Sequence, residues 1–191
     1  QEQELALRRI AVSALGDIAK HTPELAQEVI DVRAISNIAP LLSNPDAKLK
    51  QQVCTTLARI ATHSVDCAEL VVDGGIFPNA RNCLKDKDAG VRKSAAVLIR
   101  EVVKHTEQLA TLVVNNGGHA ALIEYLKPSA GNDPLNAVLA VGFISGFSIA
   151  LAQEMIKVDA PNVLVAVFKN ATQNAVRAST AWTLGQLGKH S

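Results

Sequence analysis

The sequence predicts an all-α protein built as a stack of similar helical repeats. Three observations lead to this prediction. A segment that begins at His21 returns at His63 and again at His105, with a step of 42 residues each time. Apolar columns keep the same step, and apolar residues inside each repeat follow helical spacing. A fixed period of this size is typical of solenoids, in which neighbouring repeats bury each other's apolar faces.

Four apolar columns carry the period. They are Leu15, Leu57, Ile99 and Val141; Ile18, Ile60, Val102 and Ile144; Leu42, Leu84, Leu126 and Phe168; and Ala26, Ala68, Ala110 and Ala152. The loop over 127–134 looks longer than its counterparts, yet Leu151 and Ala152 fall back into phase. The columns predict a single solenoid over 1–191. Its parts are a partial repeat over 1–20 and complete repeats over 21–62, 63–104, 105–146 and 147–191.

Each complete repeat is predicted to hold three helices. In the first one, a short helix over Pro23–Asp31 carries Leu25, Ala26, Val29 and Ile30 on one apolar face. A second helix is expected from Ala34 to Leu42, kinked or shortened by Pro40. A longer third helix is expected from about Asp46 to Thr62, because Asn44-Pro45-Asp46 is a helix start signal.

The corner between the first two helices requires a tight turn. Gly75 and Gly117 stand at this corner in two repeats, and glycine tolerates a left-handed backbone. Arg33 and Asp159 stand there in the other two. We therefore expect those two corners to be built differently.

Three helices in about 42 residues is the armadillo-repeat pattern, an α-α superhelix; HEAT repeats are the near alternative. The separate short first helix and the glycine corner favour armadillo. Because the sequence starts inside a third helix and stops at the end of another, we expect a piece of a longer solenoid with uncapped ends.

Composition narrows the function classes. The net charge of +1 and an aromatic content of 3% argue against a nucleic-acid surface. The odd number of cysteines, Cys54, Cys67 and Cys83, at apolar helical positions predicts reduced, buried thiols of an intracellular protein. The uncharged segment 137–152 imitates a membrane span, but it is shorter than the roughly 20 residues that a bilayer requires. We expect this segment to bend in its middle and expect no membrane role.

The sequence offers no catalytic chemistry. It contains no Walker loop, dinucleotide fingerprint or Cys-x-x-Cys pair. The column His21, His63, His105 and His190 suggests a metal site, but helices packed about 8–10 Å apart cannot share one zinc ion. Each imidazole is instead expected to bond backbone after a third helix. The carboxylates Asp17, Glu69 and Glu101 look scattered, without evident partners. We therefore expect no enzyme, no cofactor and no metal.

Partner binding is the function expected of such a stack, on the concave ridge of the third helices. The period places on this ridge a set of candidate partner-binding residues: Asp17, Arg59, Glu101, Leu139, Phe143, Phe147, Trp182 and Gln186. The early repeats offer charges and the later ones offer apolar groups. Two alternatives stay open for Phe143 and Phe147, an exposed apolar patch that binds a partner or side chains turned into the core.

The ridge departs from two known recognition patterns. Importin alpha carries a Trp-x-x-x-Asn ladder that grips basic peptides, whereas here there is one Trp182-x-x-x-Gln186. A row of basic residues for acidic peptides, as in beta-catenin, is absent from the sequence too. Recognition of nuclear localisation peptides is therefore disfavoured, and a peptide-binding adaptor for nuclear transport or signalling remains the alternative function.

Several segments resemble the sperm-associated antigen 6 family, armadillo proteins of the flagellar central apparatus. The segments are 10–26, 44–50, 83–88, 98–101, 113–115 and 181–190, and they include the non-core Lys85-Asp86-Lys87-Asp88. The resemblance implies a non-catalytic scaffold of the axoneme, in the cytoskeleton of the cytoplasm, that supports the central pair of microtubules and motility. The implied partners are other central-apparatus proteins and, directly or through them, microtubules. Self-association through the uncapped ends is also among the expected contacts.

Overall fold

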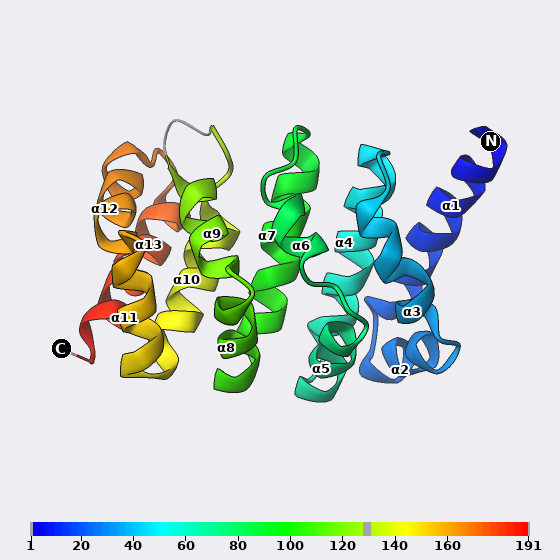
Figure 1. Cartoon of the computed structure of the whole chain (residues 1–191), viewed down its shortest axis with the longest axis horizontal. Coiled ribbons are helices and arrows are strands. Elements are labelled where there is room, and N and C mark those ends of the chain that lie inside the picture. The colour runs from blue at the N-terminus through cyan, green and yellow to red at the C-terminus, as the bar shows by residue number, and fades with distance from the viewer. Residues whose placement is uncertain (1, 128–130, 191) are drawn as a thin grey trace. The chain divides into compact units, whose positions relative to one another are not determined.

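The computed structural model describes residues 2–127 and 131–190, and these residues form helices joined by short turns (Figure 1). The chain divides into two compact units between Val102 and Val103. This division lies two residues before the predicted repeat boundary at 104/105. The predicted longer loop 127–134 includes residues 128–130, which lie outside the described residues, as do the terminal residues 1 and 191 of the predicted outer repeats.

After a long first helix, the first unit holds two sets of helices, and in the first set the second helix consists of α3 followed directly by η1. Its elements are α1 (Glu2–Ala19), α2 (Pro23–Asp31), α3 (Ala34–Ile38), the 3-10 helix η1 (Ala39–Ser43), α4 (Ala47–Ala61), α5 (Val65–Asp73), α6 (Asn79–Cys83) and α7 (Ala89–Val103). The long helices α1 and α4 pack against each other, and α2 and η1 pack onto α4.

The second unit also holds two sets in which two shorter helices precede a longer third one. Its elements are α8 (Glu107–Asn115), α9 (Gly118–Leu126), α10 (Leu135–Phe147), α11 (Ile149–Lys157), α12 (Ala160–Asn170) and α13 (Asn174–Gly188). Here α10 packs along α13, the counterpart of the contact between α1 and α4.

The second helix of the first complete repeat is shortened, as predicted from Pro40. The α-helical part α3 ends at Ile38, and η1 takes over with Pro40 in its first turn. Proline is tolerated there because the first turn of a helix does not use that backbone N–H. The third helix follows its start signal, since Asp46 caps α4 by accepting a hydrogen bond from the Leu49 N–H at 2.7 Å.

The short first helices share one capping rule that the sequence analysis did not identify. Each is preceded by a hydroxyl residue in extended conformation whose side chain accepts a backbone N–H three residues later. The capping residues are Thr22, Ser64, Thr106 and Ser148. These caps satisfy backbone donors that a helix N-terminus otherwise leaves unpaired, so they fix where each repeat begins.

The corners before the second helices correct one prediction. Gly75 and Gly117 adopt φ of 74° and 72°, as expected, but Arg33 and Asp159 adopt the same left-handed conformation, at 57° and 65°. The expectation that these two corners would be built differently is wrong. The stack fixes the turn geometry, and a non-glycine residue accepts about 1–2 kcal/mol of strain to meet it.

The apolar columns form the core. Leu57, Ile60 and Ile99 are fully buried, and so are Val102, Val141 and Ile144. Ile18 in α1 is 45% exposed, and Leu15 and Phe168 of the same columns are half-buried. The three cysteines are buried and free, as predicted.

The uncharged segment 137–152 bends as predicted. Helix α10 ends at Phe147, Ser148 is extended with φ of −153°, and α11 starts at Ile149. Within residues 2–127 and 131–190, no helix has the length and hydropathy needed to span a bilayer.

Candidate functional site

In the first unit, the structure brings two predicted ridge residues together. Arg59 on α4 donates from Nη1 to Oδ1 of Asp17 on α1 at 2.9 Å, and Lys20 donates to the same oxygen at 3.1 Å. The hydrogen bond from Lys20, together with its charge and the contact from Arg59, lowers the pKa of Asp17. The carboxylate of Asp17 therefore has partners, contrary to the expectation that it would be isolated.

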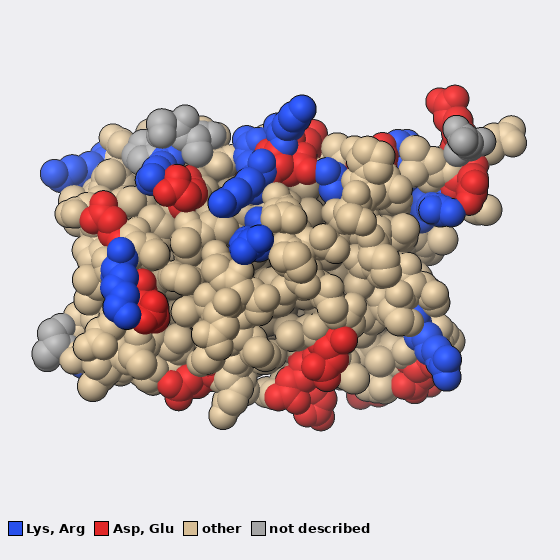
Figure 2. All heavy atoms as spheres, viewed as in Figure 1, with Lys and Arg blue, Asp and Glu red and all other residues tan. Residues whose placement is uncertain are grey.

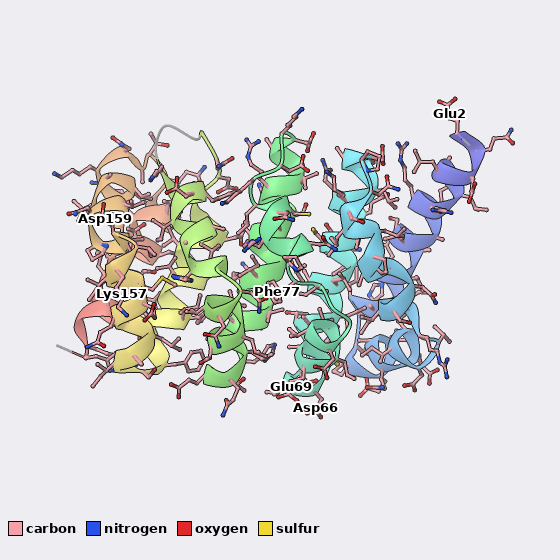
Figure 3. All side chains as sticks on the ribbon, viewed as in Figure 1. Glu2, Asp66, Glu69, Phe77, Lys157 and Asp159 are labelled. Atoms are coloured by element: carbon pink, nitrogen blue, oxygen red, sulfur yellow. The ribbon has the colours of Figure 1, made fainter. Side chains whose placement is uncertain are left out.

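Glu101 is the other partnered carboxylate of this ridge. Its side chain accepts a hydrogen bond from Thr62 Oγ1 at 2.7 Å and pairs with Arg100, and the residue is only 5% exposed. Glu101 thus fastens α7 to the end of α4. Glu69, the third carboxylate considered, lies elsewhere and points outward from α5 beside Asp66 (Figure 3).

Two shallow hollows follow this ridge. The first, of about 150 Å³, is lined by polar side chains of α1, α4 and α7, including Ser13, Gln52 and Thr55. The carboxamide Oε1 of Gln52 is buried there without a hydrogen-bond partner. The second hollow, of about 260 Å³, is lined by Ala58, Val97 and Arg59, among others. Hydroxyl and amide groups beside a small apolar surface suit the main chain and side chains of a bound peptide.

In the second unit, the predicted ridge is aromatic. The rings of Phe143 on α10 and Trp182 on α13 meet edge to face, with centroids 5.4 Å apart and planes at 70°. Trp182 is 39% exposed, and Phe143, like Phe147 and Leu139, is half-buried. Because neither phenylalanine is fully buried or fully exposed, the structure agrees with neither alternative completely. Phe143 and Trp182 form a partly exposed ring pair. It presents ring edges to solvent from a packed base.

Two glycines of α10 make this arrangement possible. A Cβ at Gly142 would lie 2.2 Å from Cζ3 of Trp182, and one at Gly146 would lie 2.7 Å from Oε1 of Gln186. Because both glycines lack a side chain, α13 can lay Trp182 and Gln186 directly across α10. The structure therefore places Trp182 and Gln186 over the same helix as Phe143 and Phe147.

A hydrogen bond that the sequence analysis missed joins successive third helices in both units. Thr56 Oγ1 donates to the Val12 carbonyl at 2.9 Å, and Thr183 Oγ1 donates to the Val138 carbonyl at 3.0 Å. The two threonines occupy the same position of the repeat. The other repeats have Ala14, Leu98 and Ala140 there, so no constant column signals the bond.

Two histidines of the predicted column, His63 and His190, differ in the contacts of their Nε2 atoms. Nε2 of His63 lies 2.6 Å from the Ala19 carbonyl at the end of α1, which confirms the predicted backbone bond for this residue. Nε2 of His190, in contrast, is buried without a hydrogen-bond partner. In the part of the chain that the structure describes, no three His, Cys, Asp or Glu side chains are grouped to hold a metal ion.

Comparisons with known proteins give the fold. No family model matches the sequence, and no curated protein matches it either. Among solved structures, the designed armadillo repeat protein YIII(Dq)4CqI matches with a TM-score of 0.92 and 20% identity, over 100% of this chain and 79% of that chain.

Two further structures agree. A designed armadillo repeat protein in complex with the peptide (KR)4 has a TM-score of 0.92 and 20% identity, over 100% of this chain and 78% of that one. ARO, the "armadillo repeats only" protein from Plasmodium falciparum, has a TM-score of 0.79 and 14% identity, over 94% of this chain and 79% of that one. This chain has the all-helical armadillo-repeat solenoid fold.

Proposed function

We propose that this chain is a non-catalytic scaffold that binds extended segments of partner proteins along its third helices. The observation that carries the proposal is the half-exposed pair of Phe143 and Trp182, held on a rigid base by the glycines of α10. Aromatic side chains that are fixed in place and partly exposed are typical anchors of protein interfaces.

The first unit supports the same function with different chemistry. Its ridge carries two hollows, and beside the first of them Arg59 and Asp17 pair with each other. A partner segment there would contact hydroxyl and amide groups such as those of Ser13, Gln52 and Thr55. The similar designed armadillo protein in complex with the peptide (KR)4 is a precedent for peptide binding by this fold.

The cellular part of the proposal is a role in the central pair of the ciliary or flagellar axoneme. It rests on the sequence resemblance to the sperm-associated antigen 6 family. The partners would be other central-apparatus proteins, and microtubules directly or through them. Such a scaffold would support the integrity of the central apparatus and motility.

Two substitutions test the binding surface. The purified chain is mixed with isolated central-apparatus material, and the bound fraction is compared for wild type, Phe143→Ser and Ile156→Ser. Ile156 is a matched control, since it is 54% exposed on α11, away from the third helices. We expect Phe143→Ser to reduce binding about tenfold, a typical loss for an interface anchor, and Ile156→Ser to leave it unchanged. Equal binding by all three proteins would contradict the proposed surface.

The alternative function is a peptide-binding adaptor for nuclear transport or signalling. The pair Trp182 and Gln186 on α13 favours it, because it supplies one rung of the ladder on which such adaptors hold peptides. Localisation of the tagged full-length protein in a flagellated cell separates the two functions. Label along the axoneme is expected, and a nuclear signal with an unlabelled axoneme would favour the adaptor.

A further inference from the structure

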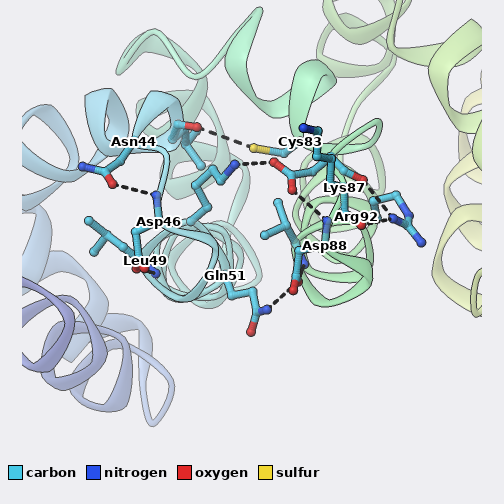
Figure 4. A network of polar contacts seen from close by, with 12 residues as sticks. Asn44, Asp46, Leu49, Gln51, Cys83, Lys87, Asp88 and Arg92 are labelled. Atoms are coloured by element: carbon cyan, nitrogen blue, oxygen red, sulfur yellow. Dashed lines mark hydrogen bonds and ion pairs between the residues drawn. The ribbon is translucent and has the colours of Figure 1, made fainter. Parts of the chain in front are cut away.

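In the corner between α6 and α7, acidic and basic residues alternate in the sequence, and the structure turns the acidic side chains inward and leaves the basic ones exposed. The corner consists of Lys85-Asp86-Lys87-Asp88. Asp86 forms an ion pair with Lys50 of α4 in which the two side chains are only 16% and 13% exposed (Figure 4). Asp88 caps α7 by accepting the Val91 N–H at 2.9 Å and also accepts Gln51 Nε2 at 2.7 Å. Both acidic side chains are thus used inside the fold.

The two lysines of this corner are exposed. Their backbone is held in place, because Arg92 donates from Nη1 to the carbonyls of Asp86 at 2.8 Å and Lys87 at 2.9 Å. Lys48, exposed at the start of α4, lines a hollow together with Gln51 of the same helix, and Gln51 donates to Asp88 of this corner. The N-terminus of α7 adds a partial positive charge. Lys and Arg side chains gather where α7 begins (Figure 2).

The preceding repeat shows which residues the corner needs. Its equivalent corner is Ser43-Asn44-Pro45-Asp46. Asn44 Oδ1 accepts the Asp46 N–H at 2.9 Å, as Asp86 Oδ1 accepts the Asp88 N–H at 2.9 Å. The inward positions therefore have the same role in both corners. The other two positions of each corner are exposed, and the same turn forms with Ser43 and Pro45 in one repeat and with Lys85 and Lys87 in the next. The geometry of the turn does not account for the lysines.

We propose that Lys48, Lys85 and Lys87, together the basic corner, bind an acidic extended segment of a partner protein. The corner presents cations from a fixed backbone, which reduces the conformational entropy lost on binding. A polypeptide is favoured over nucleic acid because the chain has a net charge of only +1 and few aromatic side chains for stacking bases. This surface is additional to the aromatic ridge of the proposed function.

The test uses the complete 191-residue chain and a fluorescently labelled deca-glutamate peptide, followed by anisotropy at low ionic strength. The test variant is Lys85→Ser/Lys87→Ser, which gives the outward positions the residue type found at Ser43. The matched control is Lys127→Ser/Lys157→Ser, which removes two exposed lysines of the second unit. We expect the test variant to bind about tenfold more weakly and the control within about twofold of wild type. Lys85→Glu/Lys87→Glu should lose binding altogether.

Three results would overturn the proposal. They are unchanged affinity in the test variant, an equal loss in the control, and tighter binding of a single-stranded oligonucleotide of the same length than of the peptide. Circular dichroism melts of each variant ensure that a loss of affinity is not a loss of fold. Phe143→Ser should bind the peptide like wild type, so this experiment and the test of the proposed function can fail independently.

Discussion

The ridges of the two units share one kind of hydrogen bond between third helices, but the ridge of the first unit is charged and that of the second is aromatic. Thr56 in the first unit and Thr183 in the second each bond a carbonyl of the preceding third helix. Above this bond, the first unit shows an ion pair between Asp17 and Arg59, and the second shows aromatic rings over glycine. In both units, a side-chain bond to backbone therefore joins successive third helices. The exposed chemistry can therefore change from repeat to repeat without changing the stack.

The largest expected effect comes from filling the glycine contact of the second unit. Gly142→Val places a side chain where a Cβ alone would lie 2.2 Å from Trp182 and 2.7 Å from Thr183 Oγ1. We expect a loss of about 3 kcal/mol in the free energy of unfolding, typical of overpacking. Amide hydrogen exchange should show the loss in α10 and α13.

Gly185 is the control for this substitution. It lies in α13, and a Cβ there would have no neighbour within 4 Å. Gly185→Ala should therefore raise stability by up to about 1 kcal/mol through helix propensity. An undiminished stability in Gly142→Val would show that α13 does not depend on the close approach.

The shared threonine bond can be removed in either unit. Thr56→Val and Thr183→Val keep the shape of two buried side chains and delete only the hydroxyl. Each should cost about 1 kcal/mol, the usual net value of one hydrogen bond. Denaturant unfolding gives the total loss, and hydrogen exchange locates it. Unequal losses would show that the bond matters more under one kind of ridge chemistry.

The corners provide a comparison between repeats. A Cβ at Gly75 would meet no neighbour, so the cost of Gly75→Ala comes from its φ of 74° alone, about 1 kcal/mol. In Arg33→Gly, relief of backbone strain is offset by the greater freedom of glycine in the unfolded chain, and the net change should stay below about 0.5 kcal/mol. Thermal melts of the two variants decide whether both corners follow one rule.

The smallest expected effect is a difference between the two units in the pH at which acid begins to destabilise them. Burial lowers the pKa of His119 in the second unit, against the nearby charge of Glu154. A depressed pKa contributes stability that is complete above the unfolded value of about 6.5 and is lost as pH falls through the folded value. In the first unit, the hydrogen bond from Arg9 is the main cause that lowers the pKa of Asp46, so the same loss begins only below about pH 4.

Hydrogen exchange at decreasing pH checks this order. Helix α9, which carries His119, should lose protection as the pH falls below about 6.5, while α4 retains its protection until about pH 4. His119→Gln should abolish the loss of protection in α9 without changing the loss in α4 at lower pH. Simultaneous loss in both units would contradict the assignment to His119.

The sequence alone was sufficient for the parts of the fold that depend on local or periodic signals. The first helix over Pro23–Asp31, the fully buried Leu57 and Ile99 and the glycine corners all appear where the period places them. Period and spacing determine these features directly, because each repeat must present the same apolar face to the next.

Features that depend on three-dimensional contacts could not be predicted. The left-handed backbone of Arg33 is imposed by the stack against its own preference. Thr56 and Thr183 belong to a column without a constant residue type, so no pattern indicated their bonds. The repeat period placed Asp17 and Arg59 on the ridge. Their ion pair could not be predicted, because it depends on side-chain conformations that the sequence period does not determine.

Trp182 gives the second unit an optical property that the first unit lacks. It is the sole tryptophan of the chain, and its indole contacts Phe143 while remaining partly exposed. Emission excited selectively from tryptophan, without exciting Tyr125, therefore originates at the aromatic ridge alone. An unlabelled ligand that settles on this ridge should shift the emission to the blue, whereas one that occupies only the basic corner should leave the spectrum unchanged.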